Sequence, residues 1–383
     1  MSKIKEPTNY FFSESLSEVD PEAKNLINLE EERQARKIML IASESICPKP
    51  VKEALASVFT NLYAEGYPHM RYIRDERDEL LDFERQLTFH RRYSDRRYYK
   101  GVDYVNFIEA LAQKRCAELF TSEDVPAERI FVNVQPLSGA AANNAIYEAF
   151  LEPGDTVMGM ALDCGGHLTH GSEANRSGKF YNIVSYGVDP EKGRLNYEEI
   201  RKFAREYQPK MIIAGYSAYP WDIDWNKLRE IADEIKGGCI LHADISHTAG
   251  LAVGGVFSNP VGIADVTMFT THKTMCGPRG AVIITTDEEK SRTIETAVFP
   301  GEQGGPHICN IAAKAVCFKI AQTNEFKNLQ KKIIENAKHL AKALEDTGLK
   351  LAYGGTNSHM VLIDLKGIAT KTGFRMSGET VSR

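Results

Sequence analysis

Between about residues 129 and 286 the chain alternates short apolar runs with amphipathic stretches. The amphipathic stretches predict helices at 140–151, 197–207 and 225–235, and the apolar runs predict strands. Strands and helices that alternate at this spacing form crossover units. The pattern therefore predicts an α/β fold, in which a mainly parallel seven-stranded sheet lies between helices. The predicted strands are Ile130–Val132, Thr156–Met158, Tyr181–Val184, Met211–Ile213, Cys239–Leu241, Val266–Phe269 and Ala281–Ile284.

A second helix–strand pattern follows near the end of the sequence. Residues 324–349 predict a long amphipathic helix, and the apolar run 360–365 predicts a strand. The sequence ends about 18 residues after that run, too soon to complete a further domain of ordinary size. We therefore expect an N-terminal arm over 1–60, a large domain over 61–298 and an incomplete, smaller C-terminal α/β domain over 299–383.

Composition and charge narrow the class of protein. A chain of 383 residues with 43% hydrophobic content can bury a sizeable core, and a net charge of -5 provides no basic field for nucleic acid. The seven cysteines are scattered without a Cys-x-x-Cys pair, which favours reduced thiols over disulfides or a structural zinc site. No signal peptide or apolar run of membrane-spanning length is recognised. We expect a cytoplasmic protein without nucleic-acid, membrane or metal partners.

Polar residues follow several of the predicted strands. Ser138 follows the first strand and Ser217 the fourth, while Asp244 and His247 follow the fifth and Lys273 the sixth. Ligand sites in parallel sheets collect at the carboxyl ends of the strands. We therefore expect these side chains to converge on one edge of the sheet and form a site there.

Lys273 and Asp244 carry the most specific chemistry. Lys273 stands in the run TTHKT, before GPRG, and burial there would favour the neutral amine that forms an imine with an aldehyde. The alternative is a strand-end lysine that extends into water. Asp244 at a buried strand end needs a cationic partner, and a protonated pyridine nitrogen would supply one. The alternative for Asp244 is a cap of the next helix.

Two glycine-containing segments complete the candidate site. The run SGAA at 138–141 separates a strand from a helix, where free amides can bind a phosphate; a plain helix cap is the alternative. The run GGHLTH at 165–170 suits an imidazole laid against a ring, although His167 and His170 could also be buried core histidines or metal ligands. No Walker or GxGxxG motif is present, which argues against a nucleotide.

Taken in order, motifs over most of the chain resemble the serine hydroxymethyltransferase family. They are LIASES at 40–45, YAEGYP at 63–68, RYY at 97–99, VQPLSG at 134–139, GGHLTHG at 165–171, SAYP at 217–220, TTHKTMCGPRG at 270–280, FPGEQGGP at 299–306 and GGT at 354–356. The resemblance implies a pyridoxal-phosphate transferase of fold type I, similar to aspartate aminotransferase. It implies a homodimer or tetramer in which subunits share active sites. The implied reaction moves a one-carbon unit between serine and tetrahydrofolate, giving glycine and 5,10-methylenetetrahydrofolate.

The resemblance also assigns roles to individual residues. Lys273 would bind the cofactor covalently, Asp244 would face the pyridine nitrogen, and His167 would stack on the ring. Glu65 would be the acid–base group near the substrate hydroxymethyl and the folate. The implied catalytic residues are Lys273, Glu65, Tyr63, Tyr99, His167 and Thr270. The implied cofactor-binding residues are Ser138, Gly139, Ala140, His167, Ser217, Asp244, His247, His272, Lys273, Gly304 and Gly305, the last two from the partner chain. The implied substrate-binding residues are Ser43, Glu65, Tyr63, Tyr99 and Ser358.

The sequence departs from the family in three ways. A charged, mildly amphipathic segment at about 69–96 is an insertion, which we interpret as a surface helical excursion or as a segment that alters dimer packing or covers the folate entrance. The motif whose arginine pairs with the substrate carboxylate has no counterpart here. Several family positions also differ, which makes folate use less firmly implied than cofactor binding. They are Leu137, Ala141, Cys164, Trp221, Asn357 and Ser358.

These departures leave two alternative functions open. One is a folate-independent aldolase that cleaves β-hydroxy amino acids. The other is a catalytically silent cofactor-binding homologue that serves as a partner subunit. The missing carboxylate-binding motif favours the silent homologue, whereas the presence of Lys273, Glu65, Tyr63 and Asp244 opposes it.

Overall fold

The computed structural model describes residues 14–92, 96–369, 373 and 375–382, and the chain divides into two compact units, Met1–Glu44 and Ser45–Arg383. The first unit contains helices α2 (Leu16–Val19) and α3 (Pro21–Arg36). Helix α3 begins at Pro21 because the Asp20 carboxylate accepts a hydrogen bond from the Ala23 amide at 2.9 Å. The expected boundaries near residues 60 and 298 stay predictions.

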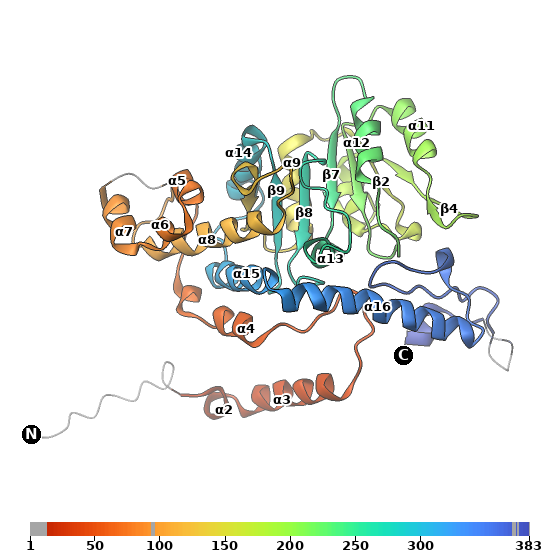
Figure 1. The fold of residues 1–383 in the computed structure, drawn as a ribbon, viewed down its shortest axis with the longest axis horizontal. Coiled ribbons are helices and arrows are strands. Elements are labelled where there is room, and N and C mark those ends of the chain that lie inside the picture. Colours follow the sequence, from red (N-terminus) through yellow and green to blue (C-terminus); the bar gives the residue numbers. More distant parts are fainter. Residues whose placement is uncertain (1–13, 93–95, 370–372, 374, 383) are drawn as a thin grey trace, which may run out of the picture. The chain divides into compact units, whose positions relative to one another are not determined.

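The second unit is built on a seven-stranded mixed sheet (Figure 1) with the strand order β1-β9-β8-β7-β6-β2-β3. Neighbouring strands from β8 through β7, β6 and β2 to β3 pair in parallel, whereas β9 pairs antiparallel with both β8 and β1. The connection 271–280 between β8 and β9 is too short for a crossover helix, so β9 turns back antiparallel. The strands are β1 Phe131–Asn133, β2 Thr156–Met160, β3 Asn182–Tyr186, β6 Met211–Gly215, β7 Ile240–Asp244, β8 Val266–Thr270 and β9 Ala281–Thr285, with β4 Val188–Asp189 and β5 Arg194–Leu195 in a separate hairpin.

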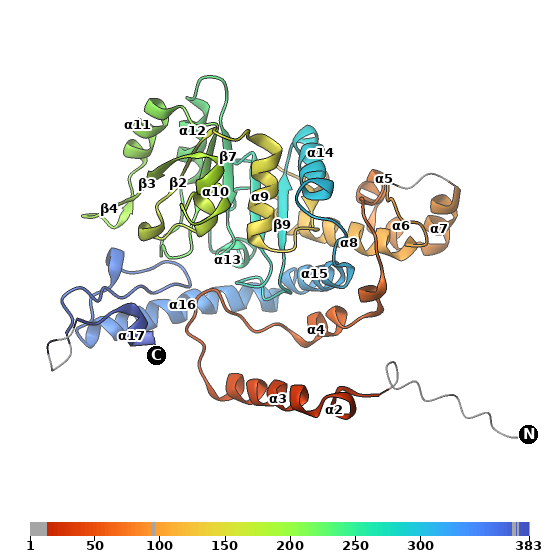
Figure 2. The ribbon, with the colours of Figure 1, turned by 180° about the vertical axis from the view of Figure 1, so that it is seen from behind.

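Helices cover both faces of this sheet. Helix α9 lies on the face turned to the viewer in Figure 2, and α12 lies on the face turned to the viewer in Figure 1. Because both faces are covered, β6, β8 and β9 are buried at every position. The helices are α4 Lys49–Leu55, α5 Met70–Arg74, α6 Arg77–Leu81, α7 Phe83–Arg92, α8 Asp103–Leu119, α9 Gly139–Phe150, α10 Arg176–Phe180, α11 Tyr197–Tyr207, α12 Trp225–Asp233, α13 Ala249–Val253, α14 Glu288–Thr296, α15 Ile308–Ala321, α16 Asn324–Asp346 and α17 Gly378–Ser382.

The predicted α/β sheet is therefore confirmed strand by strand, with ends that differ by at most three residues from those expected. The predicted helices correspond to α9, α11, α12 and α16. Among the described helices, none is both long and apolar enough to cross a membrane.

The prediction of a strand at 360–365 is wrong. In the described part of this segment only Ile363 pairs, in an isolated bridge with Leu351. Strands form where a neighbouring backbone satisfies their N–H and C=O groups over several residues. The apolar pattern alone therefore predicted the burial of Met360, which is 3% exposed, but not the partner that a strand needs.

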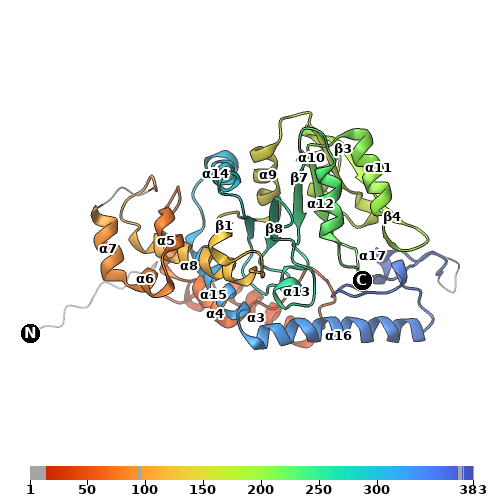
Figure 3. The same cartoon turned by 45° about the horizontal axis from the view of Figure 1, so that its top comes forward.

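The segment expected to be an insertion forms helices α5, α6 and α7, which lie beside α8 at one end of the second unit (Figures 1 and 3). Its apolar side chains pack against Phe107 and Ala110 of α8, with Tyr72 and Leu80 buried. The Tyr72 and Phe107 rings meet edge to face with centroids 5.4 Å apart. The segment thus has its own small apolar cluster on one flank of the domain.

Leu80 and Leu81 are matched probes of this cluster, because Leu80 is 0% exposed and Leu81 is 40% exposed. We expect Leu80→Ala to lower the free energy of unfolding by about 2–4 kcal/mol, since it removes buried methyl groups and leaves a cavity. Leu81→Ala should change it by less than about 1 kcal/mol. Urea unfolding of both variants provides the measurement. Equal effects would mean that the cluster does not stabilise the segment.

Candidate functional site

The carboxyl ends of the central strands bring together the polar residues expected there. Asp244 is the last residue of β7, and its neighbours in the ladder are Gly215 of β6 and Met268 of β8. Lys273 lies in the turn that follows β8. Asp244 and Lys273 are 7% and 9% exposed, so neither is a solvated surface charge. The expected convergence on one edge of the sheet is therefore present in the structure.

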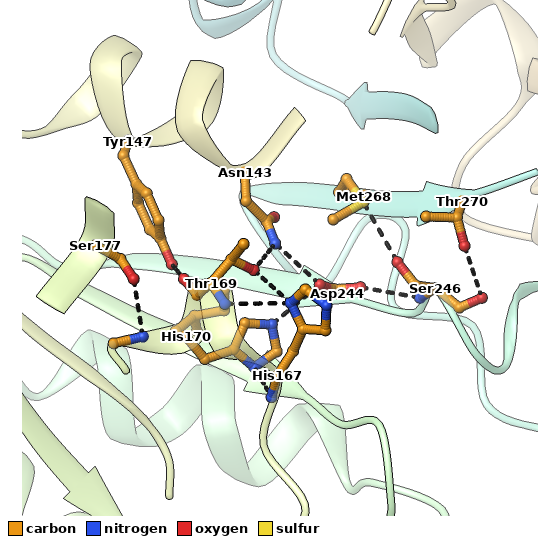
Figure 4. A network of polar contacts seen from close by, with 12 residues as sticks. Asn143, Tyr147, His167, Thr169, His170, Ser177, Asp244, Ser246, Met268 and Thr270 are labelled. Atoms are coloured by element: carbon orange, nitrogen blue, oxygen red, sulfur yellow. Dashed lines mark hydrogen bonds and ion pairs between the residues drawn. The ribbon is translucent and has the colours of Figure 1, made fainter. Parts of the chain in front are cut away.

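Asp244 is held by three donors from different elements (Figure 4). Its Oδ2 atom accepts hydrogen bonds from His170 Nε2 at 3.0 Å and from Asn143 Nδ2 at 3.1 Å. Its Oδ1 atom accepts from the Ser246 amide at 3.0 Å. The carboxylate does not cap the next helix, because the N-cap of α13 is Thr248. Asp244 is thus oriented within the site rather than used to begin a helix.

The electrostatics of the site keep Asp244 ionised. Burial alone would raise its pKa, but the hydrogen bonds from His170 and Ser246 and the nearby Lys273 charge hold the pKa well below its usual range. His170 is itself fixed, since the residue before it, Thr169, is held by α9: Asn143 donates to Thr169 Oγ1 at 2.8 Å, and Tyr147 donates to the Thr169 carbonyl at 2.6 Å. A fixed, ionised carboxylate is available to a cationic partner.

Lys273 has an environment that favours the neutral amine. Burial lowers its pKa, the Asp244 charge opposes that shift, and Arg279 adds to it. Among the described residues, the Lys273 Nζ atom makes no hydrogen bond or ion pair, and the residue is fixed through its backbone, where its carbonyl accepts from the Cys276 amide at 2.9 Å. The end of β8 before its turn is packed closely: Thr270 is 4% exposed and lies against Gly139, where a Cβ would come within 2.8 Å of Thr270 Cγ2.

Histidines surround this edge of the sheet. His167 Nδ1 lies 2.8 Å from Thr169 Oγ1 and accepts from the Thr169 amide at 3.2 Å, and burial lowers the pKa of His167. His247 Nδ1 lies 3.4 Å from His359 Nε2 with the two rings stacked, and burial with the nearby Lys273 charge holds the pKa of His247 well below its usual range. Burial also lowers the pKa of His272 to about 4. These rings are therefore neutral at physiological pH.

The glycines before His167 are required by close backbone packing. A Cβ on Gly165 would come within 2.3 Å of the Ala218 carbonyl, and one on Gly166 within 2.0 Å of the Met160 carbonyl. The Gly165 carbonyl accepts from the Ser217 amide at 2.7 Å. The segments that carry His167 and Ser217 are thereby fixed against each other.

The loop after β1 forms the start of α9. Ser138 is the N-cap of this helix, and its Oγ accepts from the Ala141 amide at 3.3 Å. The expected plain cap is therefore present, and Ser138 and Ala140 are also exposed at the first turn of a 12-residue helix. The free amides of that turn can bind an anion.

A second group of expected residues gathers elsewhere in the same chain. The Tyr63 and Tyr99 rings lie 4.9 Å apart and are about half exposed, and a Cβ on Gly305 would come within 2.9 Å of the Tyr63 ring. A Cβ on Gly304 would lie 3.4 Å from Glu65 Oε1. Among the described residues, no hydrogen bond, ion pair or ring contact joins this group to Asp244 or Lys273.

Two expected substrate-binding residues, Ser358 and Ser43, are not connected to Asp244 or Lys273 by any contact described above. Ser358 is 0% exposed, and its hydroxyl accepts from the Met360 amide at 3.1 Å, so it is used inside its own turn. Ser43 belongs to the first unit, Met1–Glu44, which is described by itself. Residue-level reasoning did not find Asn143, whose only signal was an amide within the apolar helix 140–151. No group of metal-ligating side chains that could hold a metal ion occurs in the described ranges, where His170 binds Asp244 instead.

Comparison with known proteins matches this chain to the family described as serine hydroxymethyltransferase, over residues 16–94 and 85–377. The first match ends at residue 94 and the second begins at residue 85, so both of these positions lie inside the segment 69–96. Proteins named serine hydroxymethyltransferase from Acinetobacter radioresistens and Alcanivorax borkumensis are 44% and 46% identical to this chain. The first match covers 93% of this chain and 77% of the relative, and the second covers 92% and 76%.

The buried ring of His242, two residues before Asp244 in β7, predicts a loss of stability in acid. Burial lowers its pKa to about 3, and neither ring nitrogen has a partner among the described residues. An unfolded histidine takes up a proton below about pH 6.5, whereas the folded one does not. Because the unfolded state binds more protons, stability falls as the pH drops, by about 2 kcal/mol between pH 7 and 5 from this residue. Urea unfolding at both pH values should show a smaller decrease for His242→Leu. The same decrease in both proteins would contradict the assignment.

Proposed function

This chain belongs to the serine hydroxymethyltransferase family, and on that basis we propose that the residues around Asp244 and Lys273 form its catalytic site. The family's enzymes depend on pyridoxal phosphate and transfer a one-carbon unit between serine and tetrahydrofolate, giving glycine. We assign that activity to this chain. The observation that carries the site assignment is the ionised Asp244 carboxylate next to the buried Lys273 amine.

The residues at this edge fit pyridoxal phosphate. An ionised carboxylate with three fixed donors suits a pyridinium nitrogen, because it needs a cationic partner and cannot rotate away from it. The buried amine of Lys273 suits the aldehyde carbon, and the amides at the start of α9 suit the phosphate. When bound, pyridoxal phosphate supplies an electron sink for the bonding pair released at the amino-acid Cα.

We assign the remaining roles from the same arrangement. Lys273 holds the cofactor and takes or returns the proton at its own Nζ, which is easier for an amine whose pKa is lowered. Asp244 keeps its charge next to the ring nitrogen, and His167 stacks on the ring. Ser217 and His247 would contact the phenolic oxygen. Ser138, Gly139 and Ala140 would hold the phosphate, and Thr270 and His272 would flank Lys273.

The second group supports a shared site. We propose that Tyr63, Glu65 and Tyr99 of one subunit, with Gly304 and Gly305, complete the site of its partner, and that Glu65 moves a proton at the substrate hydroxyl. The lack of any described contact between this group and Lys273 in one chain agrees with that arrangement. The protein would then be a homodimer or tetramer of fold type I, active in the cytoplasm, and its C-terminal segment would begin the smaller domain.

Lys273→Ala tests the proposal most directly. We expect glycine formation from serine and tetrahydrofolate to fall by at least about 10²-fold, because the covalent attachment and the proton carrier are both lost. Borohydride should leave a pyridoxyl adduct on wild-type Lys273 and none at this position in the variant. Lys319→Ala, at an exposed site on α15, is the matched control and should retain both activity and the adduct.

The same assay separates the alternative functions. Glycine formation that does not require tetrahydrofolate would support a β-hydroxy amino acid aldolase. A protein that binds pyridoxal phosphate, but whose absorbance does not change at saturating glycine, would be a silent homologue. Wild-type protein that remains colourless after pyridoxal phosphate is added would contradict the cofactor assignment itself.

A further inference from the structure

Helix α15 carries a lysine that is enclosed by the protein. Lys314 is 2% exposed, although lysines seldom lose contact with water. Its Nζ atom donates to the carbonyl oxygens of Val134 at 2.6 Å, Ala281 at 2.9 Å and Pro136 at 3.2 Å. Three carbonyl acceptors require three N–H donors, and only the ammonium form of lysine has three. The geometry is therefore that of a buried cation.

The three carbonyls belong to the segments that carry the proposed cofactor site. Val134 and Pro136 lie in the loop between β1 and Ser138, whereas Ala281 is the first residue after the turn that holds Lys273. The loop and the turn also bond directly, because the Ala281 amide donates to the Pro136 carbonyl at 3.0 Å. A Cβ on Gly280 would come within 2.7 Å of Lys314 Cε, so the ammonium fits closely against the turn.

The surroundings of Lys314 are mostly apolar. The nearest charged and titratable groups are Glu109 and Cys116 of α8, Cys317 of α15 and His272 of the turn. Burial lowers the pKa of Lys314 to about 7, while Glu109 opposes the shift.

Glu109 is already engaged by other donors. It accepts from Arg97 Nη2 at 2.6 Å and from Gln135 Nε2 at 2.8 Å. Protonated Lys314 therefore leaves an excess of positive charge behind the loop that leads to Ser138. An anion bound at the start of α9 would compensate for that excess.

We propose that Lys314 is a positioning residue for the cofactor phosphate: its ammonium group fixes the loop before Ser138 against the Lys273 turn and supplies a buried positive charge behind the phosphate. This inference rests on the proposed function, because it takes the start of α9 as the phosphate site. It differs from a purely structural role in one respect. A structural lysine would affect all ligands of the site equally, whereas this charge acts on ligands that carry a phosphate.

Lys314→Met removes the charge and keeps the length of the side chain. The probes are pyridoxine 5′-phosphate and pyridoxine, which lack the aldehyde and therefore do not react with Lys273. We expect the variant to bind pyridoxine 5′-phosphate about tenfold or more weakly, with pyridoxine affinity changed by less than about threefold. Calorimetric titration gives both dissociation constants. An equal loss for both ligands, or no loss for either, would overturn the proposal.

Two controls keep the test decisive. Phe318→Leu, at a buried position on the same helix, should lower the thermal midpoint without changing the ratio of the two affinities. If the methionine variant does not fold, Lys314→Gln retains two N–H donors without the charge and should show the same selective loss.

In the wild type, the preference for the phosphorylated ligand should fall as pH rises from about 7 to 9, as the ammonium deprotonates. A preference that is the same at both pH values, or that falls equally in the variant, would also overturn the proposal. Failure of the wild type to bind either ligand would instead contradict the proposed function.

Discussion

The site depends on an ionised carboxylate, that of Asp244, which is buried at the carboxyl end of β7. An ionised carboxylate in the interior is costly unless donors surround it. Asp244 has an imidazole, an amide side chain and a backbone amide as donors, from three different elements. His170 and Asn143 meet this need for donors directly. Tyr147 contributes indirectly, because it donates to the carbonyl of Thr169, the residue before His170. The carboxylate, in turn, makes this edge of the sheet suitable for a cationic ring.

A second buried polar network includes Gln135 of the loop after β1 and is centred on Arg97 and Glu109. Arg97 donates to the carbonyls of Ala64 and Gly66 and to Glu109, and Gln135 donates to both Gly66 and Glu109. The network therefore ties the segment of Tyr63 and Glu65 to the loop before Ser138. Arg97 and Glu109 therefore connect the segments of both groups of proposed site residues, although no hydrogen bond, ion pair or ring contact between described residues joins the two groups directly.

Two departures from the family pattern, Trp221 and the segment 69–96, make packing contacts of their own in the structure. The Trp221 ring lies under the Arg194 guanidinium, 3.3 Å from its centre, and Trp221 Nε1 and Arg194 Nη1 both donate to the Tyr353 carbonyl, at 3.1 and 2.9 Å. Trp221 thus joins the residue before the GGT turn to the rest of the unit, with the Arg194 cation of β5 stacked on its ring. The segment 69–96 is accommodated similarly, because its apolar residues pack on α8 rather than displacing the sheet.

The sequence by itself determined the order and type of the main elements. The alternation of apolar and amphipathic runs is a local property, and it identified the seven strands together with Asp244 and Lys273 at their ends. Only the tertiary structure decided which groups hold Asp244, because His170 and Asn143 are 74 and 101 positions away in the chain. It also decided that β9 runs antiparallel and that residues 360–365 form no strand. Strand pairing and polar contacts are made between residues far apart in the chain. The pattern of neighbouring residues does not specify which of these distant residues lie close together in the folded protein.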